Sequence, residues 1–74
     1  MSETIVALGE QALLEGFPLA GVQLRVAETD HAVHEGWALL PKTTGIVILT
    51  PRAARALGGI LDDPRSPMTV VLPL

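Results

Sequence analysis

The chain contains no cysteine. This absence excludes disulfide crosslinks and thiolate metal sites, and it is compatible with a reducing compartment. Aromatic residues are also scarce, at 3% of the sequence, with Phe17 and Trp37 as the only two. Trp37 recurs at helical spacing with Val33 and Leu40, so we expect it to pack in the core and not to contact a partner.

Basic residues and long apolar runs are also few. The formal net charge is −3, and the Lys and Arg residues are scattered at Arg25, Lys42, Arg52, Arg55 and Arg65. Affinity for nucleic acid requires clustered Lys and Arg, so we expect no nucleic-acid partner. No run approaches the roughly 18 apolar residues of a membrane span. The first apolar run follows Glu3 and stops at Leu8, which does not fit a secretory signal. We expect a cytoplasmic protein with no direct membrane insertion.

What the sequence does contain is a regular alternation of strand-like and helix-like segments. The 74 residues are 49% hydrophobic, enough for one folded domain spanning residues 1–74. Strand-like runs are TIVAL at 4–8, VQLRVA at 22–27, GIVILT at 45–50 and MTVVLPL at 68–74. The first and third are apolar at consecutive positions, which is typical of central parallel strands, whereas the second alternates like an edge strand.

Capping residues mark two helices between these runs. Thr29 or Asp30 can cap a helix that Pro41 must end. Thr50 can cap the next helix, with Pro51 in its first position and apolar residues including Leu57 and either Ile60 or Leu61 on one face. The glycines at 58 and 59 weaken or end that helix, and DDPRSP at 62–67 predicts a loop.

The order of elements predicts an α/β domain with a small flavodoxin-like (Rossmann-like) three-layer fold. We expect a four-stranded parallel sheet in the order 2-1-3-4, with both later helices on one face. The other face is left to GEQALLEGFPLAG at 9–21, with room for about two helical turns before Gly16 and Pro18. Phe17 is expected to be buried over this thinly covered face. The last run would be an apolar edge strand. The thinly covered face and this edge both predict a partner, a second copy or a missing piece of chain.

Motifs for chemistry are weak. A dinucleotide loop needs G-x-G-x-x-G after the first strand, but Gly9 is followed only by Gly16. A phosphoacceptor domain needs an Asp after the third strand, which ends in Leu49-Thr50-Pro51. His31 and His34, with Glu35 four residues after His31, have a spacing that could hold a metal. Two or three ligands on an exposed helix face, with no Cys and no other His, make a poor site, so a solvated helix face is the preferred interpretation. We therefore expect no enzyme and no catalytic, cofactor-binding or metal-binding residue.

Partner contact is the remaining interpretation for five residues. Arg52 and Arg55 lie one helical turn apart, with Arg65 in the following loop. Together they form a local basic cluster. Either these residues are the solvated face of a helix, or they dock onto an acidic surface of a partner. Val70 and Leu72 belong to the apolar edge strand and are candidates for contact with a partner or a second copy.

The succession of segments resembles the F subunit of the V-type and A-type rotary ATPases and ATP synthases. The succession is GFPLAGV at 16–22, VAET at 26–29, GIVILT at 45–50 and a closing apolar strand that ends in Leu72-Pro73, and its most specific portions are GF-x-LAGV and AET. The resemblance implies that the Gly-Phe-Pro-Leu-Ala-Gly stretch is structural, a bend into the second strand. Family members continue into a C-terminal helix, whereas this chain stops at Leu74.

The resemblance also implies a function. Members are non-catalytic central-stalk subunits that contact the shaft and the catalytic head, so the expected partners are those two subunits of a proton- or sodium-translocating rotary ATPase, with no cofactor. The alternative is a free-standing interaction or regulatory domain of this fold that forms homo-oligomers and is unrelated to a rotary motor.

Overall fold

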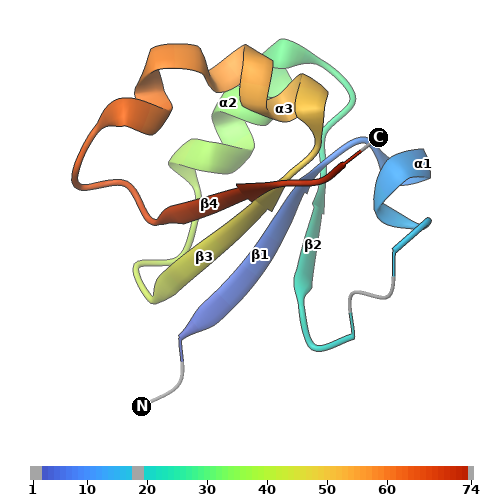
Figure 1. The fold of residues 1–74 in the computed structure, drawn as a ribbon, viewed down its shortest axis with the longest axis horizontal. Helices are drawn as coiled ribbons and strands as arrows, with labels where there is room; N and C mark the ends of the chain where they lie inside the picture. The colour runs from blue at the N-terminus through green and yellow to red at the C-terminus, as the bar shows by residue number, and fades with distance from the viewer. Residues whose placement is uncertain (1–2, 18–19, 74) are drawn as a thin grey trace.

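A computed structural model describes residues 3–17 and 20–73 of the chain. Four parallel strands form one sheet in the order β2-β1-β3-β4 (Figure 1). The strands are β1 (Thr4–Gly9), β2 (Gln23–Val26), β3 (Thr44–Leu49) and β4 (Met68–Val71). The helices are α1 (Gln11–Leu14), α2 (Asp30–Ala38) and α3 (Pro51–Leu57), which continues into the 3₁₀ helix η1 (Gly58–Asp62). The predicted fold class and strand order are confirmed.

Helix α2 begins and ends where its sequence signals lie. The Thr29 side chain accepts a hydrogen bond from the Ala32 N–H at 3.1 Å, which satisfies one of the free donors of the first turn. The helix ends at Ala38, just before Pro41. Its apolar stripe faces the sheet, because Val33 is buried and Trp37 packs against the core as predicted.

Helix α3 shows the same local control. The Thr50 side chain accepts from the Ala53 N–H at 3.2 Å, and Pro51 occupies the first turn, where it loses no hydrogen bond. The helix ends at Leu57, and Gly58 follows with a positive φ of 50°. Within η1 it is Leu61 that packs on the core, while Ile60 is exposed.

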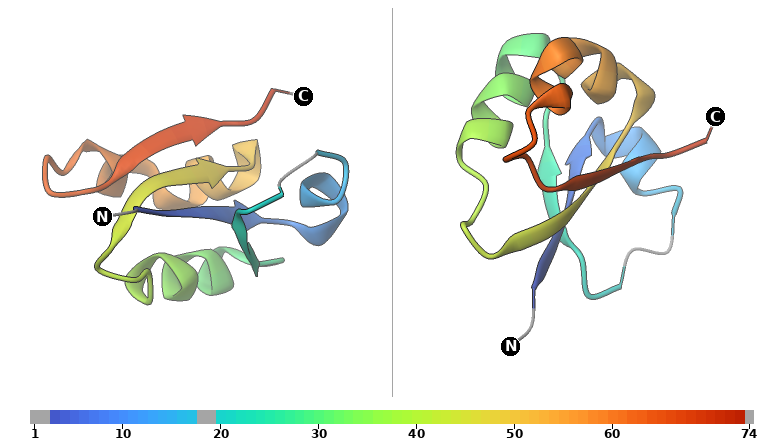
Figure 2. Two further views of the ribbon diagram at one scale, coloured as in Figure 1. Left: turned by 90° about the horizontal axis from the view of Figure 1, so that it is seen from below. Right: turned by 60° about the vertical axis from the view of Figure 1, so that its left-hand side comes forward.

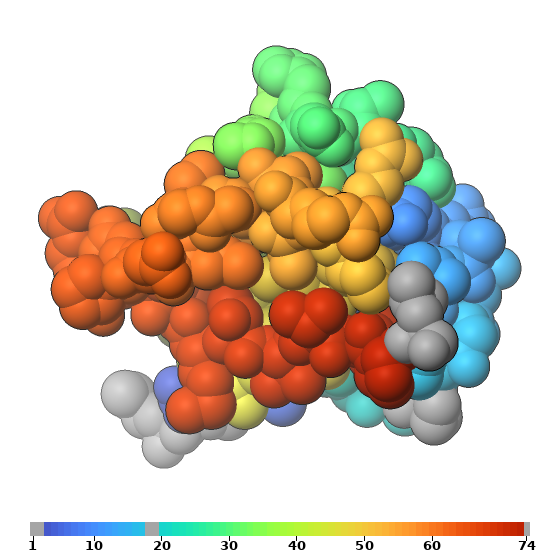
Figure 3. Space-filling model, turned by 45° about the horizontal axis from the view of Figure 1, so that its top comes forward, coloured from blue at the N-terminus to red at the C-terminus, as the bar shows by residue number. Residues whose placement is uncertain are grey.

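The main core lies between α2, α3 and one face of the sheet, which we call the helical face. Its buried members are Leu8, Ala27, Val33, Val47, Leu49, Ala53 and Leu57. Figure 3 shows this helical layer as a closed surface, with β4 in red along its lower margin and no helix in front of it. The sheet is therefore well covered on this side.

The opposite face is covered much less, because α1 is short. It spans four residues, about one turn, so the expectation of about two turns is wrong. Leu14 is its buried residue. Phe17 is half-buried, so the expectation of a buried ring is also wrong, and Pro18 lies outside the described residues. The third layer of the fold is thus reduced to a single turn.

The carboxyl ends of β1 and β3 meet at Thr50, which is fully buried. Its hydroxyl donates to the carboxylate of Glu10, directly after β1, while also accepting from the first turn of α3. Gly9 lies against the same side chain, and a Cβ at position 9 would overlap the Thr50 hydroxyl and methyl groups. One side chain therefore links β1, β3 and α3.

We predict that Thr50→Val destabilises the domain by about 2–3 kcal/mol. Valine keeps the shape but removes both the helix cap, worth about 1 kcal/mol, and a buried hydrogen bond to a carboxylate. Thr50→Ser keeps the hydroxyl and should cost about 1 kcal/mol for the lost methyl group. Denaturant unfolding measures both, and equal stability of the valine variant and the original chain would contradict the assignment.

We predict that Phe17→Ala lowers the free energy of unfolding by about 2 kcal/mol. Removing a fully buried phenylalanine costs about 3–5 kcal/mol, and this ring is only partly covered. The same denaturant melt decides the matter. A loss above about 3 kcal/mol would mean that the ring is fully buried in solution and that the face beneath it is well covered.

Candidate docking surface

The sheet face opposite α2 and α3 is composed of apolar side chains, and we call it the bare face. Side chains alternate between faces along a strand, and residues in register on parallel neighbours share a face. Because Leu8, Val47 and Leu49 lie in the helical-face core, the positions that alternate with them along β1 and β3 point to the opposite face. The bare face therefore consists of Ile5 and Ala7 from β1, Leu24 and Val26 from β2, Ile46 and Ile48 from β3, and Met68 and Val70 from β4.

Several of these side chains are open to solvent. The exposed fractions are 68% for Met68, 50% for Leu24, 51% for Val26 and 49% for Val70. Ile46 and Ile48, on the central strand β3, are only partly covered. In the left view of Figure 2 no helix crosses in front of β1, β3 or β4. The most exposed of these side chains lie on the two edge strands, whereas Ala7 of β1 on the same face is fully buried. Exposed apolar side chains gathered on one face are typical of interaction sites, whereas single exposed ones are ordinary.

The strands bring no charged side chain to the bare face. Arg25, the charged residue of β2, is in register with Leu8 and so points to the helical face, as does Gln23. Glu3 precedes β1 at the rim, where its carboxylate lies close to Gly45. The part of the bare face that the strands supply is therefore apolar and uncharged.

The crevice beyond the carboxyl ends of β1 and β3 is where open parallel sheets usually bind ligands. Here two glutamates occupy it. Glu10 accepts the Thr50 hydroxyl, and Glu28 accepts the backbone N–H of Gln11, the first residue of α1, at 3.1 Å. That N–H is of the kind that would bind a phosphate oxygen, and the carboxylates would repel an anion. The crevice is thus closed by the chain's own carboxylates.

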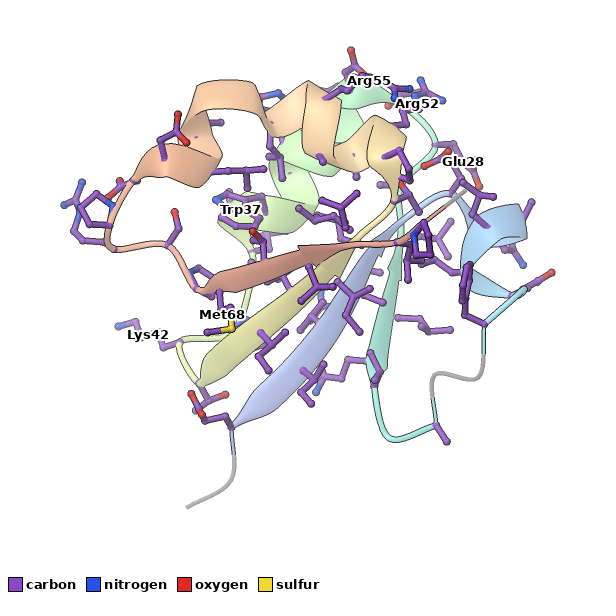
Figure 4. All side chains as sticks on the ribbon, viewed as in Figure 1. Glu28, Trp37, Lys42, Arg52, Arg55 and Met68 are labelled. Carbon is purple, nitrogen blue, oxygen red and sulfur yellow. The ribbon has the colours of Figure 1, made fainter. Side chains whose placement is uncertain are left out.

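The three arginines proposed for partner contact do not share one surface. Arg52 lies 3.8 Å from Asp30 at the start of α2, and Figure 4 shows Arg55 beside it. The loop that carries Arg65 leaves the far end of η1 (Figure 1), and Arg65 forms an ion pair with Asp63 at 3.2 Å. The expected basic cluster is therefore limited to Arg52 and Arg55.

Val70 and Leu72, the apolar contact candidates, do belong to one surface. Val70 lies on the bare face, and Leu72 follows it with the same alternation just beyond the end of β4. The sequence analysis expected this face to be thinly covered but named none of its other residues as contact candidates. The signal was present, because consecutive apolar residues in β1 and β3 require cover on both sides and α1 is too short to supply it.

Both histidine rings contact other groups of the protein. The His31 ring lies 3.5 Å from Glu35 on the exposed side of α2, and His34 Nε2 lies 2.8 Å from the carbonyl of Ala56 in α3. His34 therefore links the two helices of the helical layer. Within residues 3–17 and 20–73, no group of three or more His, Asp or Glu side chains could hold a metal ion.

A pocket of about 490 Å³ opens beside Trp37, where β3 and β4 begin. Its size suits a small molecule, but such sites also need convergent polar groups. Asp63 is held by Arg65, and the Ser66 hydroxyl donates to a carbonyl of η1 at 3.3 Å. The buried Thr44 hydroxyl has no hydrogen-bond partner among the described residues. The Asp63 and Ser66 side chains of the pocket are therefore hydrogen-bonded within the protein itself.

The ion pair in this pocket leads to a titration prediction. Hydrogen bonds from the Arg65 side chain and then from its backbone N–H lower the pKa of Asp63 below its ordinary value of 3.8. Because the pKa of Asp63 is lower in the folded state than in the unfolded state, its carboxylate stabilises the fold at pH values above the unfolded-state pKa. This contribution is lost as the pH falls through the folded-state pKa.

Arg65→Gln should raise the pKa of Asp63 toward 3.8, since the backbone N–H remains as the second cause of the shift. An NMR titration of the Asp63 side-chain carboxyl carbon in both proteins measures this change. An unchanged pKa would show that the Arg65 side chain does not hold the carboxylate in solution.

Comparisons with known proteins do not assign the chain to a family. Along the described segments, no helix combines the length and the apolar character needed to cross a membrane. No protein-family model matches the chain, and a search of curated proteins finds no similar one.

Proposed function

We propose that this chain is a non-catalytic protein-docking domain of the F-subunit type, which binds the shaft and the catalytic head in the central stalk of a rotary ATPase. The observation that carries the proposal is the bare face, an uncharged apolar surface that extends over all four strands. The central strands β1 and β3 have no charged side chain on either face, as expected for a sheet built to be covered on both sides.

Burial of the bare face supplies the driving force for docking. A parallel sheet is stable in water when helices cover both faces, and here α1 covers only part of one. Covering the remainder in trans should contribute about 1 kcal/mol for each half-exposed Leu, Val or Met side chain. Leu24, Val26, Met68 and Val70 are all of this kind.

The closed crevice supports a non-catalytic role. Glu28 uses the Gln11 N–H, and Glu10 is committed to Thr50, so the usual ligand position of this fold is filled by structural hydrogen bonds. The resemblance to the rotary-ATPase F subunit, carried by GFPLAGV at 16–22 and VAET at 26–29, is what names the partners. In this role the chain would be cytoplasmic and held near the membrane by the ATPase complex.

A free-standing interaction domain that associates with itself is the second candidate. One observation favours it: the edge strand β4 carries no charge that would oppose pairing with another copy. In this case the fold is shared with the F-subunit family and the rotary motor is not involved.

Co-purification from the native cells tests the proposed function. We expect a tagged chain to recover the shaft and head subunits, as identified by mass spectrometry. Leu24→Glu should weaken this binding at least about 30-fold, because a carboxylate would be buried unpaired in the contact. Leu24 lies on β2, away from β4, and it is half exposed, so the folded domain should tolerate the change.

Leu39→Glu is the matched control. Leu39 is also an exposed leucine, at 71%, but it follows α2 on the other side of the sheet, so its variant should keep the partners. Equal loss in both variants would argue against the bare face. Recovery of unrelated proteins in a manner that depends on Leu24 would keep the docking face and overturn the stalk assignment.

A further inference from the structure

Strand β4 leaves one row of backbone groups unused. The Leu72 N–H donates to the Leu49 carbonyl at 2.8 Å, so the backbone groups of Leu72 point toward β3. Because this direction alternates along a strand, Thr69 and Val71 direct their N–H and C=O groups away from the sheet. The strand is the last in the sheet order, and none of the other described strands pairs with this side.

The exposed edge also lacks the features that usually prevent edge pairing. Natural edge strands carry charged side chains, an internal proline or a bulge. β2, at the other edge, has Arg25, whereas β4 reads Met-Thr-Val-Val with neither a charge nor a proline. Pro67 and Pro73 flank it and lack an N–H, so the donors of this edge are confined to Thr69 and Val71.

We propose that a second copy of this chain pairs with β4, antiparallel, across a two-fold axis beside Val70. In this register Thr69 of each copy lies opposite Val71 of the other. The two residues of each such pair exchange both of their backbone hydrogen bonds, and the symmetry supplies two pairs. All four outward N–H donors are then used within β4, and the flanking prolines face each other where no donor is needed.

The side chains in this register are complementary without charge. Val70 lies opposite its counterpart, and Met68 lies opposite Leu72 of the second copy, all on the bare face. Thr69 lies opposite Val71 on the helical face. No like charges are brought together, although each chain carries a net charge of −3. Because both strands of the pair are then β4, a second copy of the chain supplies these matching side chains.

The two bare faces become continuous in this arrangement, because the two-fold axis runs perpendicular to the joined sheet. The contact is small beside the roughly 800 Å² per partner of a stable interface, so dimerisation should depend on concentration. It does not depend on the stalk role, because the hydrogen bonds of the pairing come from the β4 backbone, and it gives a geometry to the self-association of the second candidate function. Met68 and Val70 belong both to this contact and to the bare face.

Crosslinking tests the register directly, because the chain has no cysteine of its own. Val70 and its counterpart form a non-hydrogen-bonded pair, with Cα atoms about 4.5 Å apart, within the roughly 4.4–6.8 Å of disulfides. Val70→Cys should therefore form a disulfide-linked species of twice the 7.8 kDa chain mass under mild oxidation. Leu24→Cys, equally exposed on the other edge strand, should remain at the mass of one chain.

Charge exchange gives a second and independent measurement. Val70→Lys and Val70→Glu should each sediment as a monomer at concentrations where the original chain dimerises, because each would place like charges on the two-fold axis. A mixture of the two should form a mixed dimer. Circular dichroism establishes that each variant keeps its fold, and Val70 is half exposed, so neither change fills the core.

The proposal is overturned if Val70→Cys does not crosslink, if Leu24→Cys crosslinks equally well, or if the Lys and Glu variants fail to combine. Leu24→Glu separates the two proposals of partner binding. It should lose the docking partner and still dimerise, whereas Val70→Lys should lose the dimer and also weaken docking, because Val70 lies on the bare face as well as beside the two-fold axis. If the chain stays monomeric at high concentration but binds its docking partner, the dimer proposal is wrong and the docking proposal stands.

Discussion

The contact between Thr50 and the end of β1 is the constraint on which the rest of the fold depends. Thr50 is fully buried, it binds Glu10, and it caps α3. Gly9 leaves the space that the threonine side chain occupies. The chain leaves the sheet at both places, so this one contact joins the residue before α1 to the start of α3 beyond the carboxyl ends of β1 and β3. It also places Glu10 at the point where a ligand would otherwise enter.

The hydrogen bonds at the carboxyl ends of the strands are unusual for this fold. The carboxyl edge of a parallel sheet usually carries the chemistry. Here Glu10 and Glu28 accept structural hydrogen bonds from Thr50 and Gln11 at that edge, and the surface left available is a sheet face. The cause is the one-turn length of α1, which leaves Ile46 and Ile48 partly uncovered on a central strand. An uncovered apolar sheet face of this kind is typical of protein-contact surfaces.

The two faces and the two edges of the sheet are not equivalent. The helical face is closed by α2 and α3, which are joined through the contact between His34 and the Ala56 carbonyl. Arg25 protects the β2 edge, whereas β4 has no such residue. A face and an adjoining edge are therefore open on the same domain, and they differ in what they can bind: side chains on the face, backbone groups on the edge.

Much of the fold could be predicted from the sequence because its signals are local. Thr29, Thr50 and Pro51 lie within one turn of the helix ends that they determine, and the apolar runs of β1 and β3 identify the central strands. Other features were decided only by tertiary structure, because they join distant segments. Glu28 and Gln11 are far apart in the chain, and so are Thr50 and Glu10. Arg65 lies close to Arg55 in sequence but is carried away by η1 to pair with Asp63. A periodic pattern shows that a face is apolar, but whether it is covered depends on the length of another segment and on where that segment packs.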